Sequence, residues 1–395
     1  MREYERTHPW INFVATDVNE IRPRHWMLLG EARSKCEHLA GAPLKPEVAQ
    51  ELYQVTLVKG ALATTAIEGN TLTEEQVRGI LDGSYKAPPS RQYQEQEARN
   101  VLDALQSVHD RIAAGEQIRL TSDLICRFNY QILKDTQLHE DVTPGEIRTG
   151  SVVVGNYRAA PAEDCQYLLD RLVDWLNDPM FTHDDPEIQF ALLLAKAVYA
   201  HLYLAWIHPF GDGNGRTARL AEFVILAGSG QVPIPAAHLL SNHYNLTRDR
   251  YYFELARASK QNQTLGFLSY AIEGFIDGIR EAISMVREQQ IEVAWINYVH
   301  DRFASQPNTP AAHRERSLVL AMPMDKPVPR DDLEGLTPKI AKLYAGAGPR
   351  VLSRDLNKLE KLGLIRQAGR GYVACADLVQ AFLVPMAATE EDSFS

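Results

Sequence analysis

The sequence has few of the features that mark disulfide-rich proteins, secreted proteins and proteins that bind nucleic acid over their whole surface. It has only four cysteines in 395 residues and no CxxC pair, which predicts reduced thiols in a cytoplasmic protein rather than a disulfide framework. The first residues, MREYERTHPWINF, carry early charges and lack the apolar stretch of a signal peptide. Positive charge is not in excess, since 41 basic and 51 acidic residues give −10 at pH 7. A surface that binds nucleic acid over its whole extent is therefore disfavoured, whereas a local basic patch remains compatible.

Long hydrophobic runs are also scarce. The run from Phe190 to Ile207 is long enough to raise the question of a membrane span. It contains Lys196 and His201 and follows acidic residues, so we expect a buried core helix. The composition, 45% hydrophobic and 23% charged, is ordinary for a globular protein. At about 150 residues per domain, the length suggests two or three domains.

Helical periodicity covers most of the chain, and the expected fold class is mainly α. Thr73 and Gln76 fit the capping-box pattern, which places the start of a short helix just after Thr73. The one clear β pattern is GSVVVGNYRAA at 150–160, where Gly155 and Asn156 predict the tight turn of a hairpin. From apolar spacing we expect helices over residues 26–40, 46–66, 74–82, 93–113, 121–134, 163–177, 187–207, 215–228, 247–260 and 264–290.

Residues 208–219, HPFGDGNGRTAR, are dense in glycine and charge. Three glycines alternate with Asp212 and Asn214, so backbone N–H groups can converge on an anion without side-chain bulk. A helix that begins near Gly215 would add the partial positive charge of its N-terminus at the same place. The pattern predicts a phosphate-binding loop.

Four charged or titratable side chains complete this loop. Arg216 and Arg219 share one helix face and can both reach a polyphosphate. Asp212 is a hard carboxylate suited to Mg²⁺ shared with phosphate oxygens, and His208 can act as a general base near neutral pH. No GK[ST] follows, and a helix rather than a strand precedes, which excludes the Walker and Rossmann loops. We therefore predict a Mg-nucleotide site with a base that deprotonates a hydroxyl.

The same stretch resembles the signature of the Fic family, HxFx[D/E]GNGRxxR, at every specified position. We take the resemblance to cover residues 1–290, most tightly 201–219. It implies a Fic-type helical core and a protein adenylyltransferase, which transfers AMP from ATP to a Ser, Thr or Tyr hydroxyl of a target protein, or of itself, and releases pyrophosphate.

Carried over residue by residue, the resemblance implies a role for each signature position. His208 would deprotonate the target hydroxyl, and Asp212 would hold Mg²⁺ between the α- and β-phosphates. Arg216 and Arg219 would bind the outer phosphates, with Arg219 on the γ-phosphate. The other nucleotide-binding residues that it implies are Gly213, Asn214, Gly215, Thr217 and Ala218.

A second pattern, TTAIEG at 64–69, resembles the inhibitory motif of the family, [S/T]xxxE[G/N]. It ends an expected inhibitory helix at about 46–69. The resemblance implies that Glu68 pairs with Arg219 and forces ATP into an unproductive pose. In some relatives the same glutamate positions water for the removal of AMP, so Glu68 is compatible with addition and removal. The alternative is an ordinary carboxylate at a helix end.

The hairpin at 147–160 lies where Fic proteins carry a flap. An exposed strand edge can pair with an extended target segment and bring its hydroxyl to the base. Thr149, Gly150 and Ser151 are the expected docking backbone, and an ordinary surface hairpin is the alternative.

Tyr251 and Tyr252 resemble the family's aromatic contact to the nucleotide base. Stacking of a tyrosine ring on adenine is physically reasonable. Helical spacing places one ring of such a pair in the core, and we favour Tyr251 as the contact.

The segment 349–373 resembles the recognition helix and wing of a winged helix-turn-helix domain. A leucine stripe is followed by two short expected strands with a glycine-rich turn, and residues 349–370 contain six basic and two acidic residues. The expected basic face consists of Arg350, Arg354, Lys358 and Lys361. Contact with DNA phosphates is one interpretation. The alternatives are a solvated helix face, or a wing used for protein contact or homodimerisation.

We therefore expect an N-terminal helical region at 1–110, a catalytic core at 111–290 and a winged-helix-like domain at 291–395. Three functions compete: a self-inhibited protein adenylyltransferase, a DNA-binding regulator whose Fic core senses nucleotide, and an enzyme with another donor or with AMP removal as its reaction. The intact pair of arginines favours a triphosphate donor.

Overall fold

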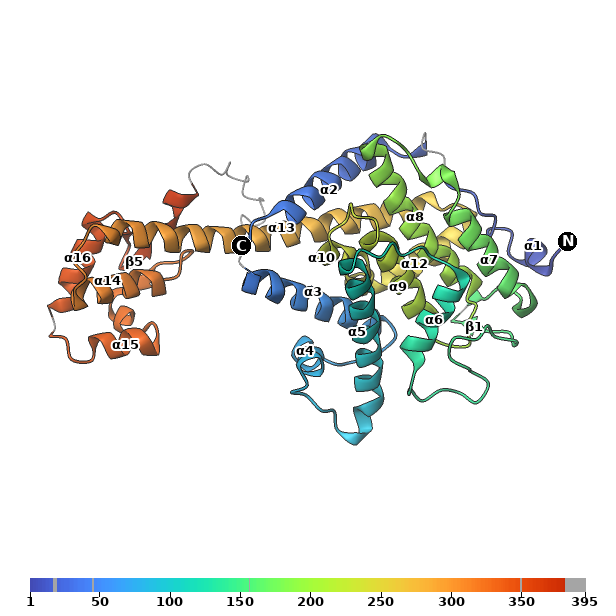
Figure 1. Ribbon diagram of the computed structural model, residues 1–395, viewed down its shortest axis with the longest axis horizontal. Helices are drawn as coiled ribbons and strands as arrows, with labels where there is room; N and C mark the ends of the chain where they lie inside the picture. Colours follow the sequence, from blue (N-terminus) through green and yellow to red (C-terminus); the bar gives the residue numbers. More distant parts are fainter. Residues whose placement is uncertain (17–19, 45, 156, 349, 381–395) are drawn as a thin grey trace. The chain divides into compact units, whose positions relative to one another are not determined.

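The fold is described from a computed structural model, which covers residues 1–16, 20–44, 46–155, 157–348 and 350–380 (Figure 1). The chain divides into two compact units, Met1–Ile283 and Ser284–Ser395. The division falls inside one helix, α13 (Leu265–Ala304), and precedes the boundary expected at residue 291. The region expected at 1–110 lies within the first unit, together with all of the region expected at 111–290 except its last seven residues.

The first unit is helical, as the apolar spacing predicts. Each of the ten expected helices is present, with ends that differ by a few residues except in α13, which continues past 290. Three shorter helices, α1, α10 and α11, were not expected, because segments of four to eight residues show too little periodicity. In chain order the helices before α13 are α1 (Glu3–Thr7), α2 (Pro23–Gly41), α3 (Pro46–Ile67), α4 (Glu74–Asp82), α5 (Gln92–Ala113), α6 (Ser122–Leu133), α7 (Cys165–Leu176), α8 (Pro186–Ile207), α9 (Asn214–Ala227), α10 (Ile234–Ala237), α11 (Leu239–Leu246) and α12 (Arg248–Gln261).

Local chemistry sets several of these ends. Thr73 caps α4 with the reciprocal bonds of a capping box: its hydroxyl accepts from the Gln76 N–H, and the Gln76 side chain accepts from the Thr73 N–H. Gly83 ends α4 in the left-handed region at φ 77°. Single 3-10 turns, η2 (Pro89–Arg91), η3 (Ala162–Asp164) and η4 (Pro179–Phe181), shape the connections.

The helix α8 forms the centre of the first unit. It is long and apolar enough to span a membrane, but 78% of its apolar window is buried inside the molecule, which agrees with the expected core helix. α9 packs extensively along α8, and α3 packs against α5, α9 and α11. The loop between α8 and α9 is therefore held by two core helices, and the end of α3 lies beside the start of α9.

The expected hairpin precedes α7. Its strands β1 (Val153–Val154) and β2 (Tyr157–Arg158) pair antiparallel, with Val153 opposite Arg158. Gly155 adopts φ 57°, which a tight turn requires, and Asn156 lies outside the described residues. Both valines of β1 are exposed. The only β pairing beyond the hairpin within this part of the described chain is a single bridge between Ile147 and Phe210, which joins its base to the loop after α8.

The second unit has its own core and, in the residues that the structure describes, combines the C-terminal part of α13 and three further helices with a small sheet. The helices are α14 (Pro310–Ala321), α15 (Pro338–Tyr344) and α16 (Val351–Lys361), with 3-10 turns η5 (Arg330–Gly335) and η6 (Ala376–Val379). The antiparallel sheet has the order β3 (Val328–Pro329), β5 (Gly371–Ala374), β4 (Ile365–Ala368). The helix and two strands expected at 349–376 are thus present, and the winged-helix assignment stays a prediction.

Candidate active site

His208 ends α8 in an unusual backbone conformation. Its φ of 52° and ψ of 59° lie in the left-handed region, and its N–H donates to the Leu204 carbonyl at 2.9 Å. This conformation is costly for a residue with a Cβ and turns the chain sharply out of the helix. The half-buried imidazole keeps Nδ1 at 3.4 Å from the Ala205 carbonyl. With the proton on Nδ1 facing that carbonyl, Nε2 retains a lone pair.

The surroundings keep this imidazole neutral. Burial lowers the pKa of His208 to about 4, and the nearby Arg148 adds to the shift, while the Ala205 carbonyl, Glu68 and Asp212 oppose it. A histidine with this pKa is unprotonated at neutral pH and is able to accept a proton. The predicted base is therefore present in its basic form.

The conformation of the loop after His208 depends on its glycines and on the side-chain amide of Asn214. Gly213 adopts φ 74° at the start of α9, and a Cβ there would lie 3.0 Å from the Asn129 Nδ2 atom. The Asn214 side chain accepts from the Phe210 N–H at 2.9 Å and donates to the Phe210 carbonyl at 2.8 Å. Asn214 thus braces the loop with its side chain and offers an anion only its backbone N–H. The N–H groups that open a helix have no partner within it, so this end can receive a negative group.

Asp212 is the carboxylate of the loop. Its side chain is half exposed, and its Oδ1 accepts from the Gly213 N–H and lies 3.4 Å from Arg216 Nη2. No cluster of three or more His, Cys, Asp or Glu side chains suited to a metal occurs in the part of the chain that the structure describes. A single accessible carboxylate fits Mg²⁺, which takes most of its ligands from phosphate oxygens and water.

Arg216 is buried without adequate partners. Its side chain is 5% exposed, and its Nη1 lies 3.4 Å from a carboxylate oxygen of Glu97 on α5. Among the described residues, Nε and Nη1 of Arg216 have no hydrogen-bond acceptor. Buried polar groups without partners are rare, and guanidinium donors match phosphate oxygens well. This observation supports an anion-binding role for Arg216.

Arg219 is buried and fully engaged. Its side chain is 1% exposed, and Nη2 contacts Glu68 Oε1 at 2.6 Å, as the inhibitory pattern predicts. Thr64 at the start of the same motif accepts from Nε through its hydroxyl at 2.6 Å and from Nη2 through its carbonyl at 2.8 Å. Burial raises the pKa of Glu68, but the Arg219 guanidinium outweighs burial and holds this pKa below its ordinary value. The end of α3 therefore occupies Arg219 with an ionised carboxylate.

The remaining signature positions shape the start of α9. A Cβ on Gly215 would lie 2.2 Å from Glu68 Oε1, so this glycine gives Glu68 room to approach. The buried Thr217 accepts from Asn129 Nδ2 at 3.2 Å, and Ala218 is fully buried. The side chains of Thr217 and Ala218 thus serve packing, which leaves only their backbone for a ligand.

The two tyrosines of α12 occupy different environments. Tyr251, favoured from the sequence as the base contact, is 3% exposed and shares a hydrogen bond of 2.8 Å with His201 in an aromatic core. Tyr252 is 42% exposed, with the guanidinium of Arg248 over its ring. This burial favours Tyr252 over Tyr251 for stacking, because a ring in the packed core has no free face.

The flap residues are exposed at one end of the site. Thr149, Gly150 and Ser151 are exposed, and Arg148 beside them is buried. Arg148, which the sequence analysis missed, donates from Nε to the His208 carbonyl at 2.7 Å and from Nη1 to the Gly150 carbonyl at 2.6 Å. Its Nη2 donates to the Ala160 carbonyl. One side chain therefore ties both ends of the flap to the residue that carries the base.

Asn129 on α6 is a second missed residue. It is fully buried, donates to the Asp212 carbonyl at 2.9 Å and accepts from the Gly145 N–H at 2.9 Å. It joins the segment before the flap to the loop after His208. A polar residue on the apolar face of an amphipathic helix is the signal that could have identified it.

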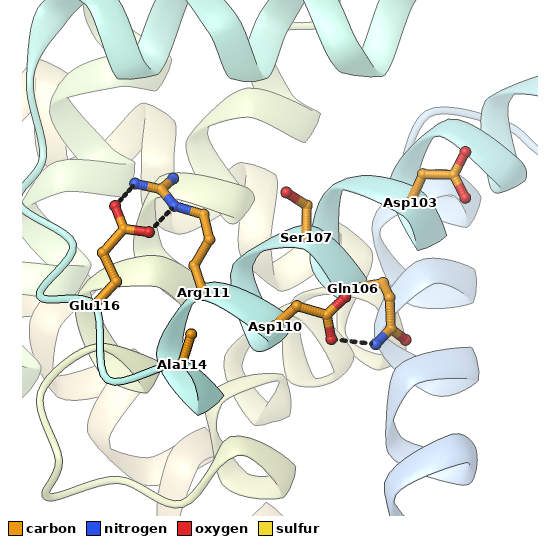
Figure 2. Close-up of a pocket in the computed structure, with 7 residues that line it drawn as sticks. All are labelled: Asp103, Gln106, Ser107, Asp110, Arg111, Ala114 and Glu116. Atoms are coloured by element: carbon orange, nitrogen blue, oxygen red, sulfur yellow. Dashed lines mark hydrogen bonds and ion pairs between the residues drawn. The ribbon is translucent and has the colours of Figure 1, made fainter.

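A surface hollow elsewhere in the first unit does not belong to this site. Figure 2 shows that most of its polar groups bond one another: Arg111 donates to both oxygens of Glu116, at 2.8 and 2.6 Å, and the Gln106 amide donates to Asp110. No residue of the 208–219 segment lines it. Its lining consists of Asp103, Gln106, Ser107, Asp110, Arg111, Ala114 and Glu116, from α5 and the segment after it.

Comparison with known proteins relates this chain to the Fic/DOC family. Residues 119–226 match the model of the Fic/DOC family. The chain is 31% identical over 229 residues to protein adenylyltransferase fic-1 of Caenorhabditis elegans, which covers 58% of this chain and 41% of that protein. It is 31% identical over 173 residues to protein adenylyltransferase Fic of Nematostella vectensis, which covers 43% of this chain and 38% of that protein. The chain thus spans about two fifths of the length of these curated relatives.

Solved structures extend the likeness to the fold. A Fic family protein from Desulfovibrio desulfuricans G20 superposes with a TM-score of 0.55 at 22% identity, covering 90% of this chain and 96% of that one. Fic-1 from Caenorhabditis elegans superposes with a TM-score of 0.55 at 25% identity, covering 67% of this chain and 73% of that one. The helical architecture resembles the fold of these Fic proteins, and residues 119–226, which contain the loop signature, match the Fic/DOC family model.

Proposed function

We propose that the chain is a protein adenylyltransferase that transfers AMP from ATP to the hydroxyl of a protein side chain. The observation that carries this proposal is Arg216 at the start of α9, a buried guanidinium whose Nε and Nη1 have no hydrogen-bond acceptor among the described residues. It lies in the same loop as a neutral His208. A polyphosphate would supply the missing acceptors, and an adjacent base would activate the acceptor hydroxyl. Relatives that are 31% identical to this chain over 229 and 173 residues are named protein adenylyltransferases.

The chemical step uses the lone pair of His208. Nε2 takes the proton of the target hydroxyl as its oxygen forms a bond to the α-phosphorus of ATP. The bond between that phosphorus and the bridging oxygen breaks, so pyrophosphate leaves and AMP stays on the target. His208 then returns the proton to solvent. The Ala205 carbonyl favours protonation of the imidazole and would hold the imidazolium in place.

The remaining residues position and neutralise the phosphates. Arg216 would bind the outer phosphates, together with the N–H groups at the start of α9. Asp212 would hold Mg²⁺, which neutralises phosphate charge when bound. Catalysis of this type depends on positioning and charge stabilisation more than on covalent participation by the protein. The exposed backbone at Thr149–Ser151 would guide the target segment.

We further propose that Glu68 inhibits the enzyme. Arg219 bonds the Glu68 carboxylate at 2.6 Å, and the γ-phosphate would need this same guanidinium. A triphosphate can reach Arg219 only if Glu68 leaves, and a buried arginine that loses its carboxylate strongly prefers a new anion. Movement at the end of α3 would therefore control the productive pose of ATP.

Self-labelling with α-phosphate-labelled ATP and Mg²⁺ tests both proposals. We expect Glu68→Gly to raise label incorporation at least about tenfold, since one competing ion pair is worth roughly 1.4 kcal/mol or more. The double variant Glu68→Gly, His208→Ala should lose about 100-fold or more of that rate, as expected for removal of a general base. Equal labelling in the single and the double variant would exclude His208 as the base. A wild-type rate in Glu68→Gly would exclude the inhibitory role.

Removal of AMP is the second candidate function. The Glu68 side chain is 36% exposed and close enough to His208 to influence its pKa, so its carboxylate could orient a water beside the base. Wild type that releases AMP from a pre-modified protein, with Glu68→Gly inactive in release, would favour this direction. A protein that neither adds nor removes AMP would favour a nucleotide-sensing regulator.

A further inference from the structure

One segment of the second unit, residues 337–375, is rich in positive charge and contains no residue that AMP transfer uses. Asp355 is fully buried, where Arg314 donates to both of its oxygens at 2.7 and 3.1 Å and Tyr344 donates at 3.0 Å. Its charge is therefore compensated inside the unit, and the surface is more basic than the composition suggests. Residues 337–375 contain two acidic residues, Asp355 and Glu360, against the basic Lys339, Lys342, Arg350, Arg354, Lys358, Lys361, Arg366 and Arg370.

One face of α16 carries an exposed polar stripe. Arg350, Arg354, Asn357 and Lys361 are exposed and follow one another at steps of four, three and four residues, which places them on one side of a helix. The opposite side is buried through Leu352, Leu356 and Leu359. Lys358, expected in the stripe from the sequence, is paired with the buried Glu315 at 2.6 Å. In the structure the stripe therefore contains Asn357 in place of the expected Lys358, and an asparagine side chain can form hydrogen bonds with adenine.

The neighbouring elements hold this helix in a defined frame. The Arg314–Asp355–Tyr344 cluster joins α14, α15 and α16 through buried hydrogen bonds. α15 presents the exposed Lys339 and Lys342. The β4–β5 hairpin pairs Ala368 with Gly371, so its two-residue turn places the exposed Arg370 at the tip. Cations therefore project from two consecutive helices and from the hairpin tip.

We propose that this surface binds duplex DNA, with α16 in the major groove and with α15 and the hairpin tip on the phosphate backbone. A helix held by a second helix, with arginine and asparagine on its free face, matches the shape and hydrogen-bonding groups of that groove. The cations around it supply the phosphate contacts that dominate affinity. This activity is independent of AMP transfer, because it requires no residue of the 208–219 segment.

Fluorescence anisotropy of the full chain with a labelled mixed-sequence duplex of about 30 base pairs tests the proposal. We expect binding at about 50 mM salt that weakens steeply towards about 200 mM, with a log–log slope of about −4 for four or five phosphate contacts. The variant Arg354→Ala, Lys361→Ala should weaken binding at least about tenfold and reduce the slope by about 2. The charge-matched control Lys86→Ala, Lys326→Ala removes two exposed lysines outside the surface and should bind like wild type.

A second measurement needs no substitution. Lysine acetylation followed by mass spectrometry should show that the duplex protects Lys339, Lys342 and Lys361 and leaves Lys326 reactive. Absence of binding at about 50 mM salt, equal loss in the control, or equal protection of Lys326 would each overturn the proposal. Tighter binding of an RNA duplex of the same sequence would also overturn it. So would a wild type that self-associates without binding DNA, if the double variant Arg354→Ala, Lys361→Ala no longer self-associates.

Discussion

Three arginines are buried around one loop, and they differ in what their guanidinium groups touch. Arg148 donates to the carbonyls of His208, Gly150 and Ala160. Arg219 donates to Thr64 and to the carboxylate of Glu68. Arg216 keeps two donors without an acceptor among the described residues.

The partners of each arginine indicate its role. A cation that is satisfied by backbone carbonyls alone is part of the framework, since no ligand could offer it more. A cation that is paired with a carboxylate from another segment can exchange that partner for a different anion. A buried cation that keeps N–H groups without acceptors is less favourable in the free protein than in a complex where an anion supplies those acceptors. From this comparison we infer a structural role for Arg148 and propose a regulated role for Arg219 and a ligand-binding role for Arg216.

The largest expected effect is that of Arg148→Ala on stability. This substitution leaves several buried carbonyls without donors, and we expect a loss of about 4 kcal/mol in the free energy of unfolding. Arg216→Ala is the matched control and should cost less than about 1 kcal/mol, because its donors bond little in the free protein. Urea unfolding followed by tryptophan fluorescence measures both, since four of the five tryptophans lie in the first unit. Equal losses would remove the distinction between the two arginines.

The next effect is that of Arg216→Ala on activity. In the Glu68→Gly background we expect kcat/KM for ATP to fall about 100-fold, the usual consequence of losing one well-placed donor to developing charge. Arg250→Ala removes an exposed arginine paired with Glu273 and should leave the rate unchanged. The readout is label incorporation as a function of ATP concentration. A fall of less than about threefold in Arg216→Ala would show that its unpaired donors serve no phosphate.

The smallest effect concerns pH. The pKa of His208 is lowered to about 4, so the basic form predominates throughout the range from pH 6 to 8. We expect kcat/KM of Glu68→Gly to change less than about twofold between these values, whereas a histidine at its ordinary pKa of about 6.5 would lose about fourfold. The stability that the neutral form contributes is lost progressively as pH falls from about 6.5, the pKa of an unfolded histidine, to about 4, where the folded protein also takes up the proton. A fourfold fall at pH 6 would mean that burial does not control this imidazole in the working enzyme.

Local sequence patterns sufficed wherever the chemistry is local. The capping box at Thr73, the central helix α8 and the glycine loop after His208 follow from spacing and residue type, because each depends on neighbours within a few positions. The contact between Glu68 and Arg219 joins residues 151 positions apart. It was expected only through resemblance to a family, since no periodicity connects two such distant segments.

The sequence alone could not predict several other features of the site and of α16, because they depend on which side chains are buried. No pattern distinguishes Tyr251 from Tyr252 as the exposed ring, and packing against His201 decides it. Arg148 and Asn129 are single polar residues whose roles arise from carbonyls and N–H groups that other segments bring to them. In the same way Glu315 withdraws Lys358 from the basic stripe of α16.

The sequence by itself determined the helical character of this protein and predicted a phosphate-binding loop with His208 as its base, because these follow from residue types at short spacing. The tertiary structure decided which arginine is satisfied by backbone carbonyls, which is held by the carboxylate of Glu68, and which keeps donors without an acceptor among the described residues. The physical reason is that a buried charge is defined by the groups that replace its water, and those groups come from segments that only folding brings together.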